Sequence, residues 1–328
     1  MAGVDHFAST VRGLFLKPGG LPRNSRNVPL IVAPVSAGEV AAFEVIEVPA
    51  GCRVGRLEVI EPISGASESW QTSEVDLREG MRLVGAIGGR LATRSVSGRA
   101  PGSPTPPGGV LDLLNTGGVV GLADRRDAPL VKLKVAGPID LGGGPALISG
   151  LGTIPSASRE DDSVPGPPLV LITGSDMDVG KTTCAASLSI SLRAAGIRVT
   201  YAKLTGTGRM RDLMKVCYGR PEGYFDDGRR GWDFVDAGLA TTFEIAPVQA
   251  RGVARALLRH AASQGEIVLA EIADAPNAEG SLHVATDPWL KSWIQKRGLV
   301  VCACDNTAST LTVQWLRAQF DLGDEEIL

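Results

Sequence analysis

The sequence predicts two domains of different fold class: a mostly β domain (barrel or sandwich) over residues 1–152 and an α/β domain over residues 168–328. Three observations lead to this prediction. The first half consists of short Val- and Gly-rich runs between turn residues, which is typical of antiparallel strands. The second half alternates strand-like and helix-like runs, which is typical of a parallel sheet with helices on both faces. Residues 153–167, rich in Ser, Pro and Gly, separate the halves as a linker.

The first half contains five runs whose alternating apolar pattern predicts strands. They are residues 29–35, 42–48, 55–60, 81–87 and 130–135. Each run is bounded by Gly, Pro or Ser, which form the turns between short strands. Residues 99–109 are dominated by Pro, Gly and Ser and predict an exposed loop. No long helical pattern occurs before residue 180, so we expect this half to be almost entirely β structure.

The second half contains strand-like and helix-like runs in alternation. The expected strands are residues 169–173, 198–203, 232–235, 266–272 and 299–304, and the expected helices are residues 181–195, 248–263, 288–296 and 310–320. Strands that alternate with helices form a parallel sheet, and ligands bind at the carboxyl ends of its strands. The loops that follow these strands are therefore the places where we expect a functional site.

Residues 168–183 hold the most informative motif of the chain. An apolar run ends at Gly174, and Gly180-Lys181-Thr182-Thr183 opens a helical pattern, which is the strand-loop-helix order of a P-loop. In such a loop, backbone amides and the helix N-terminus surround the phosphates of ATP. Lys181 would reach the β- and γ-phosphates, and the Thr182 hydroxyl would bind Mg²⁺. The expected nucleotide-binding residues are Gly174, Ser175, Asp176, Asp178, Val179, Gly180, Lys181, Thr182 and Thr183.

The loop after the second expected strand offers a cation, two hydroxyl groups and two glycines. We expect Lys203, Thr205, Thr207 and Gly208 to bind a substrate, with Lys203 and Lys181 as the catalytic cations. These groups suit a second phosphate or a carboxylate. The alternative is a glycine-rich turn with a surface lysine, and the position of the loop opposite the P-loop favours the binding site.

Two further loops supply carboxylates. After the third strand, Asp236 is preferred over Asp233 as a metal ligand because it lies nearer the strand end, and an Asp that caps the following turn is the alternative. After the fourth strand, Glu271 is the first candidate and Asp274 the second, at the position of a Walker-B-type acid. A carboxylate in an apolar strand is costly to bury without a cation, which favours a functional Glu271. The expected metal ligands are Thr182, Asp236 and Glu271.

Two features near the C-terminus are less informative. Asp305-Asn306-Thr307 follows the fifth strand and would contact a substrate or nucleotide, or else cap the next helix; the sequence does not separate these. Cys302 and Cys304 lie in an apolar run at a spacing that places both thiols on one face of a strand. We interpret them as buried small hydrophobic residues rather than as metal ligands.

Charge and hydropathy argue against several classes of partner. Lys plus Arg number 33 and Asp plus Glu 36, so the net charge of −3 offers no electrostatic surface for nucleic acid or for an anionic membrane. No apolar run approaches the ~20 residues of a membrane span, and the start lacks a signal-peptide pattern. We therefore expect a cytoplasmic protein with reduced cysteines.

The P-loop also resembles a known family. Gly174-Ser175-Asp176-Met177-Asp178-Val179-Gly180-Lys181-Thr182 is similar to the G-T-D-x-x-V-G-K-T loop of the dethiobiotin synthetase-like superfamily of P-loop ATPases. Residues 203–208 are similar to its K-P-V-x-[ST]-G segment, and residues 270–275 fall where it has V-E-G-A-G-G. The resemblance covers about residues 168–305 and is greatest to uncharacterised bacterial members, whereas the N-terminal half resembles no family that we can name. Departures from the family pattern are Ser175, Leu204, Ala273 and Ala275.

This resemblance implies roles for the residues that match. Lys181, Thr182 and Glu271 would hold nucleotide phosphates and Mg²⁺, with Asp236 as a candidate third metal contact. Lys203 and Thr207 would hold the substrate carboxylate or the transferring phosphoryl group. Members of the superfamily use ATP to phosphorylate a carboxylate or carbamate, and the acyl phosphate then reacts further. The family's adenine-contacting segment has no counterpart after residue 320, so a site completed in a homodimer is one expectation.

The leading hypothesis is an ATP- and Mg²⁺-dependent enzyme, of ligase or kinase type, that activates a small carboxylate-containing substrate by phosphoryl transfer. Two alternatives stay open. One is a P-loop NTPase that acts as a switch or accessory protein in cofactor or metallocentre assembly. The other is a P-loop domain that binds acyl-CoA and acts as an acyltransferase. The sequence names neither the substrate nor the nucleotide base.

Overall fold

The computed structural model describes most of the chain. The described residues are 8–9, 32–50, 52, 55–62, 70–92, 95–124, 129–140, 143–154, 163–218, 224–225, 230–303 and 308–323. The chain divides into two compact units. The first comprises residues 1–153 with 207–210 and 238–241, and the second comprises residues 154–206, 211–237 and 242–328.

The first unit is built around a β-sheet that closes on itself. Its strands are β1 (Ala8–Ser9), β2 (Val40–Glu47), β5 (Arg82–Ile87), β6 (Gly98–Arg99), β7 (Val110–Leu113), β8 (Val119–Ala123) and β9 (Lys132–Pro138). They pair in the order β1-β5-β2-β9-β7-β8-β6, and a further parallel pairing of β5 with β8 closes a ring through β2, β9 and β7. Phe43, Leu83, Leu111 and Leu133 are almost fully buried in the core of this unit. Alternation of buried and solvent-facing residues along β9 places one face of the strand inward.

A hairpin and a short helix complete the regular structure of the first unit. β3 (Arg56–Pro62) and β4 (Trp70–Asp76) pair antiparallel along their whole length. The helix α2 (Ile148–Leu151) is one turn long and buries Ile148 and Leu151. Apolar anchors of this kind hold a helix that is too short to be stable alone.

Two short segments from the second half of the chain belong to the first unit. Residues 207–210 are held there by Glu58, which is buried in β3 and accepts hydrogen bonds from Arg209 Nε at 2.7 Å and from the Met210 N–H at 3.0 Å. Asn115 Nδ2 also donates to the Gly208 carbonyl at 3.0 Å. Buried polar groups are stable only when paired, so these contacts fix the segment firmly.

The second unit contains a five-stranded parallel sheet. Its strands are β10 (Leu169–Gly174), β11 (Val199–Lys203), β13 (Gly231–Asp233), β14 (Ile267–Glu271) and β15 (Gly298–Ala303). They pair in the order β13-β11-β14-β10-β15, and all pairings are parallel. The short strand β12 (Tyr224–Phe225) precedes β13. Because the strands are parallel, the loops after β10, β11 and β14 emerge at the same edge of the sheet.

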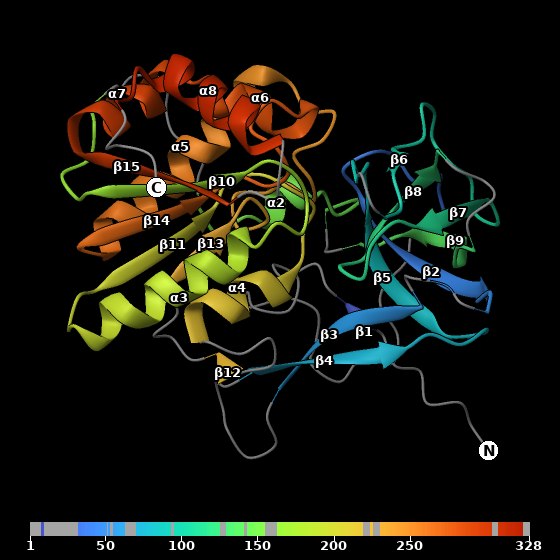
Figure 1. Ribbon diagram of the computed structural model, residues 1–328. Helices are drawn as coiled ribbons and strands as arrows, with labels where there is room; N and C mark the ends of the chain where they lie inside the picture. Colours follow the sequence, from blue (N-terminus) through green and yellow to red (C-terminus); the bar gives the residue numbers. More distant parts are fainter. Residues whose placement is uncertain are drawn as a thin grey trace. The chain divides into compact units, whose positions relative to one another are not determined.

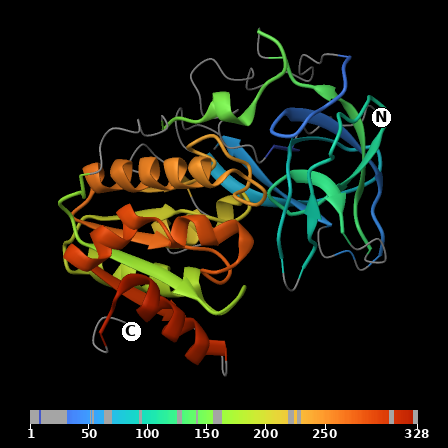
Figure 2. The ribbon, with the colours of Figure 1, turned by 90° about the horizontal axis from the view of Figure 1, so that it is seen from above.

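Helices cover both faces of this sheet (Figure 1). They are α3 (Lys181–Ala194), α4 (Met210–Tyr218), α5 (Pro247–Gln264), α6 (Glu279–Ala285), α7 (Pro288–Arg297) and α8 (Ala308–Phe320). The chain moves from β10 to β11 through α3 and returns from β13 to β14 through α5, and right-handed crossovers then place these helices on opposite faces. Figure 2 shows α5 running along the sheet. Among the described residues, no helix is both long and apolar enough to cross a membrane.

Most elements expected in the second half are present, with small shifts at their ends. The third strand is shorter than expected because it ends at Asp233, and Phe234 and Val235 lie in a turn. The helices α4 and α6 were not expected, and neither were the strands β4, β7 and β8. In the first half, Val35 forms only an isolated bridge with Thr105 rather than a strand, and residues 29–31 lie outside the described residues. Of the expected linker, residues 153–167, the part from 155 to 162 lies outside the described residues.

Truncation of a core side chain in β2 tests the packing of the first unit. Phe43 has no exposed surface, so Phe43→Ala should lower the free energy of unfolding by about 3–5 kcal/mol. Val110 in β7 is 49% exposed, and Val110→Ala should change it by less than about 0.5 kcal/mol. Urea denaturation followed by circular dichroism measures both, and equal effects would contradict the assigned core.

Candidate functional site

The turn into α3 leaves the helix N-terminus open. Gly180 adopts φ +100°, a left-handed conformation that favours glycine, and α3 begins at the next residue, Lys181. Gly180 is the N-cap residue of α3 and, having no side chain, it supplies no side-chain cap. Asp178 is also left-handed, with φ +61°, which is uncommon outside glycine and asparagine-like residues. A helix N-terminus without a side-chain cap presents backbone amides that suit an anion.

The segment before this turn is packed tightly against β15. A side chain at Gly174 would collide with the Ala303 carbonyl oxygen, and the Ser175 N–H donates to that oxygen at 3.1 Å. Asp176 accepts the Met177 N–H through its carboxylate at 2.7 Å. The loop therefore has a defined conformation that depends on a glycine at position 174.

Lys181 folds back over the loop. Its ammonium group donates to the Asp176 carbonyl, and the side chain is buried. Burial lowers the pKa of Lys181 below its ordinary value, although the nearby carboxylates of Glu271 and Asp274 oppose that shift. The lysine thus lies where its charge is poorly solvated, and an anion bound at the loop would stabilise that charge.

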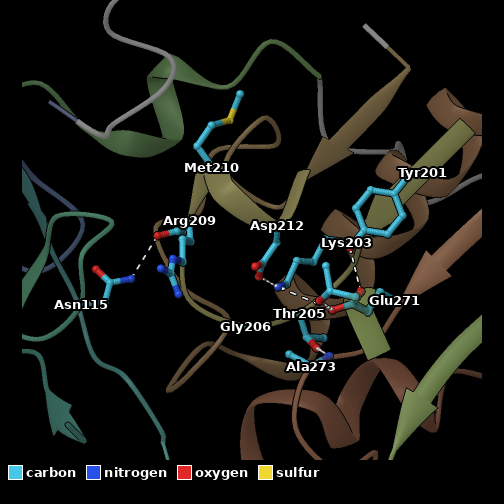
Figure 3. Close-up of polar contacts among 12 residues, drawn as sticks. Asn115, Tyr201, Lys203, Thr205, Gly206, Arg209, Met210, Asp212, Glu271 and Ala273 are labelled. Atoms are coloured by element: carbon cyan, nitrogen blue, oxygen red, sulfur yellow. Dashed lines mark hydrogen bonds and ion pairs between the residues drawn. The ribbon is translucent and has the colours of Figure 1, made fainter. Parts of the chain in front are cut away.

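Glu271 lies at the centre of the site (Figure 3). It ends β14, is 1% exposed and receives hydrogen bonds at both carboxylate oxygens. Oε1 accepts the Thr182 hydroxyl at 3.0 Å, and Oε2 accepts the Tyr201 hydroxyl at 2.9 Å. The contact with Thr182 joins two residues expected to hold Mg²⁺ that are 89 positions apart in the sequence. Burial, followed by the charge of Glu271, raises the pKa of Tyr201 well above its ordinary value.

Lys203 ends β11, beside β14, and is flanked by two carboxylates. Its ammonium group forms an ion pair with Asp212 and lies 3.6 Å from Glu271 Oε1. Burial disfavours the charge on Lys203, but Asp212 and Glu271 outweigh burial and raise the pKa of this lysine. Asp212 lies in the first turn of α4, and the sequence analysis did not identify it. Lys203 therefore carries its positive charge within a buried ionic network.

Thr205 is fully buried and its hydroxyl is engaged within the second unit. It accepts the Ala273 N–H at 2.8 Å and shares a hydrogen bond of 3.0 Å with Ser281 Oγ. Thr205 thus ties the loop after β11 to the loop after β14. Thr205 has no exposed surface, and its expected role in substrate binding stays a prediction.

Thr207 and Gly208 belong to the first unit, whereas Lys203 and Thr205 belong to the second. Thr207 forms an isolated bridge with Thr241. The Gly208 N–H donates to the Ala240 carbonyl at 2.8 Å, and its own carbonyl accepts from Asn115. Both backbone polar groups of Gly208 are therefore engaged in the first unit. The expected role of Thr207 and Gly208 in substrate binding stays a prediction.

Asp233, the last residue of β13, and Asp236 each accept a backbone N–H within the turn that follows the strand. The Asp236 carboxylate accepts the Asp233 N–H at 2.9 Å, and the Asp233 carboxylate accepts the Val235 N–H at 3.0 Å. These contacts are those of acids that stabilise a turn, the alternative stated for this loop. Asp233 also ends β13 next to Lys203, and its charge contributes to the raised pKa of that lysine. The structure thus places Asp233 in the electrostatic surroundings of Lys203, and metal binding by Asp236 stays a prediction.

The remaining candidates are placed as follows. Asp274 follows β14 with φ +53° and contributes to the electrostatics of Lys181. Thr183 Oγ1 accepts a hydrogen bond from Lys215 at 2.7 Å.

Cys302 is partly exposed, so the expectation of a buried thiol is wrong for this residue. Cys304 and the loop Asp305-Asn306-Thr307 lie outside the described residues. Within the described part of the chain, no three His, Cys, Asp or Glu residues are grouped as metal ligands.

Tyr201 and Asp212 are the residues that sequence reasoning missed. Tyr201 lies two positions before Lys203 on the same strand, and strand alternation places both side chains on one face of the sheet. This spacing was a usable signal once Lys203 was suspected. Asp212 gave a weaker signal, because α4 itself was not expected.

Comparisons with known proteins give little further information. No protein-family model matches the chain, and no curated protein matches it. Sixteen chains of solved structures match, among them the kinase domain of Escherichia coli tyrosine kinase ETK, with 16% sequence identity and a TM-score of 0.31. That match covers 47% of this chain and 64% of the kinase chain, so it spans less than two thirds of the kinase domain. A likeness of this extent determines neither fold nor function, and the resemblance to dethiobiotin synthetase stays a prediction.

Replacement of Lys203 tests the ionic network. Lys203→Met leaves the carboxylate of Glu271 buried without its cation, so the free energy of unfolding should fall by about 3 kcal/mol. Lys134→Met removes a partly exposed ion pair with Glu44 of 2.8 Å and should cost less than about 1 kcal/mol. Thermal and urea denaturation measure both variants. Equal losses would show that Lys203 is a surface lysine in solution.

Proposed function

We propose that this protein is an ATP- and Mg²⁺-dependent enzyme that phosphorylates a small carboxylate-containing substrate. The observation that carries the proposal is the 3.0 Å contact between Thr182 Oγ1 and Glu271 Oε1. It brings a hydroxyl at the start of α3 to a carboxylate at the end of β14, beside Lys181. A hydroxyl, a carboxylate and a lysine at the start of a helix whose N-cap residue is glycine are the groups that hold a nucleoside triphosphate and its metal ion.

The residues present fit Mg²⁺ in donor type. Mg²⁺ prefers oxygen ligands and binds through one or two protein groups together with phosphate oxygens and water. Thr182 and Glu271 supply a hydroxyl and a carboxylate from different elements, and these oxygens already lie within hydrogen-bond distance. When bound, Mg²⁺ would neutralise charge on the phosphate oxygens. Thr182 and Glu271 are therefore the residues proposed to hold it.

The two lysines would divide the work of charge stabilisation. Lys181, at the first position of α3, would release the Asp176 carbonyl and bind the β- and γ-phosphates. Lys203 would attract the substrate carboxylate, which would join or replace Asp212 at the ammonium group. A carboxylate oxygen of the substrate would then attack the γ-phosphorus, the bond to the β,γ-bridging oxygen would break, and ADP and an acyl phosphate would form. Positioning and electrostatics supply the catalysis, so no covalent protein intermediate is needed.

Calorimetry with ATP and acetyl-CoA, each with and without Mg²⁺, together with an assay of phosphate release, distinguishes this proposal from the alternatives of a switch protein or an acyltransferase. We expect ATP to bind more tightly when Mg²⁺ is present, and acetyl-CoA to bind no better with Mg²⁺ than without it. Phosphate release from ATP should rise when small carboxylic acids are added. Stimulation by a protein partner alone would favour the switch, and preferential binding of acetyl-CoA would favour the acyltransferase.

Removal of Lys181 tests the catalytic proposal directly. Lys181→Ala should abolish ATP-dependent turnover, because the γ-phosphoryl group loses its nearest cation. The fold should persist, since the lost contact is one hydrogen bond to the loop carbonyl of Asp176. Lys291→Ala is the control. It removes a lysine of α7 whose ammonium nitrogen lies 2.6 Å from a carboxylate oxygen of Asp321, and it should retain full activity. Full ATP-dependent activity in Lys181→Ala would refute the proposal.

A further inference from the structure

We propose that Tyr201 is a positioning residue that holds the Glu271 carboxylate in the orientation needed for Mg²⁺. This inference rests on the proposed function, because it assigns a role to Tyr201 within the same site. Tyr201 does not contact the nucleotide in this proposal. It acts through Glu271, by occupying one carboxylate oxygen and leaving the other directed at Thr182.

The register of the sheet brings the phenol to the carboxylate. β11 pairs with β14 so that Lys203 lies opposite Glu271 and Tyr201 opposite Leu269. Alternation along β11 directs Tyr201 and Lys203 to the same face. The Tyr201 hydroxyl reaches Glu271 Oε2 at 2.9 Å, and Tyr201 has no exposed surface. Figure 3 shows Tyr201 and Lys203 next to Glu271.

The two oxygens of Glu271 have different partners. Oε2 accepts the Tyr201 hydroxyl, while Oε1 accepts the Thr182 hydroxyl and lies 3.6 Å from Lys203. The terminal torsion of a glutamate side chain is broad and roughly two-fold, so backbone and packing alone do not fix which way the carboxylate plane faces. A buried donor at Oε2 fixes that plane. It also satisfies an oxygen of a carboxylate that is only 1% exposed.

Loss of the phenol should therefore weaken metal binding more than nucleotide binding. Without the Tyr201 hydroxyl, the carboxylate can rotate, and the population with Oε1 directed at Thr182 falls. The nucleotide's contacts with loop amides and Lys181 do not involve Tyr201. The expected signature is a higher Mg²⁺ requirement with an unchanged affinity for metal-free ATP.

The strand offers a matched control one residue away. Thr200 is also buried, and its hydroxyl donates to the Ala261 carbonyl at 3.0 Å, on the face of the sheet opposite Tyr201. Thr200→Val and Tyr201→Phe each remove one buried hydroxyl from β11. Both should lower stability, but only Tyr201→Phe removes a donor from Glu271.

The test is a titration of Mg²⁺ into each full-length variant saturated with a non-hydrolysable ATP analogue, followed by calorimetry. Tyr201→Phe should raise the Mg²⁺ concentration for half-saturation roughly tenfold, the effect of one lost hydrogen bond to a charged group, and Thr200→Val should leave it unchanged. Equal half-saturation in the two variants would overturn the role of Tyr201 while leaving the proposed function intact. A wild-type protein whose nucleotide binding is independent of Mg²⁺ would instead refute the proposed function, and the role of Tyr201 with it.

A double variant keeps the test decisive if Tyr201→Phe does not fold. Addition of Glu271→Gln replaces the buried carboxylate with a neutral amide, so Tyr201→Phe/Glu271→Gln should recover stability relative to Tyr201→Phe alone. Denaturant unfolding, or the yield of folded protein, measures this recovery. Absence of recovery would mean that the Tyr201 hydroxyl does not stabilise the carboxylate, and would overturn the inference.

Discussion

A buried carboxylate sets the arrangement of the second unit around it. Glu271 ends the central strand β14 with 1% of its surface exposed, and an ionised acid in such a place is stable only with donors and a cation close by. Three side chains meet this demand. The first turn of α3 supplies Thr182, and β11 supplies both Tyr201 and Lys203. The parallel pairing of β11 with β14 places Tyr201 and Lys203 beside Glu271, so the register of the sheet determines the geometry of the site.

The two lysines of the site differ in how the protein treats their charge. Burial lowers the pKa of Lys181, whose described hydrogen bond is to a neutral carbonyl, whereas the carboxylates beside Lys203 overcome burial and raise its pKa. Lys181 is thus poised to gain an anion, and Lys203 already has one in Asp212. The two ammonium groups therefore lie in different electrostatic surroundings, although both are buried near Glu271.

Local patterns were informative where one element carries its own signal. The strand expected to end near Gly174 and the helix expected to begin at Lys181 occur as β10 and α3. Both could be predicted because a buried strand has an apolar run, a left-handed turn favours glycine, and the helix has a run of small residues. The helix α4 was missed because its start follows directly on the glycine-rich loop 204–208, and Glu58 in β3 supplies part of what holds that start. The predicted strand 232–235 extended beyond the end of β13 at Asp233. The Asp236 carboxylate accepts the Asp233 N–H and stabilises a turn there, and hydrophobic periodicity does not reveal such a contact.

The sequence by itself determined the position of the candidate P-loop, the alternation of strands and helices after it, and the candidates Lys181, Thr182, Lys203 and Glu271. These follow from residue types and short spacings, which depend on interactions within a few positions. Only the tertiary structure decided which of them meet. Thr182 contacts Glu271 across 89 positions, Tyr201 contacts it across 70, and Asp212 reaches Lys203 from a helix that was not expected. Such contacts depend on strand order and register, and these are set by the packing of the whole sheet rather than by any local run of residues.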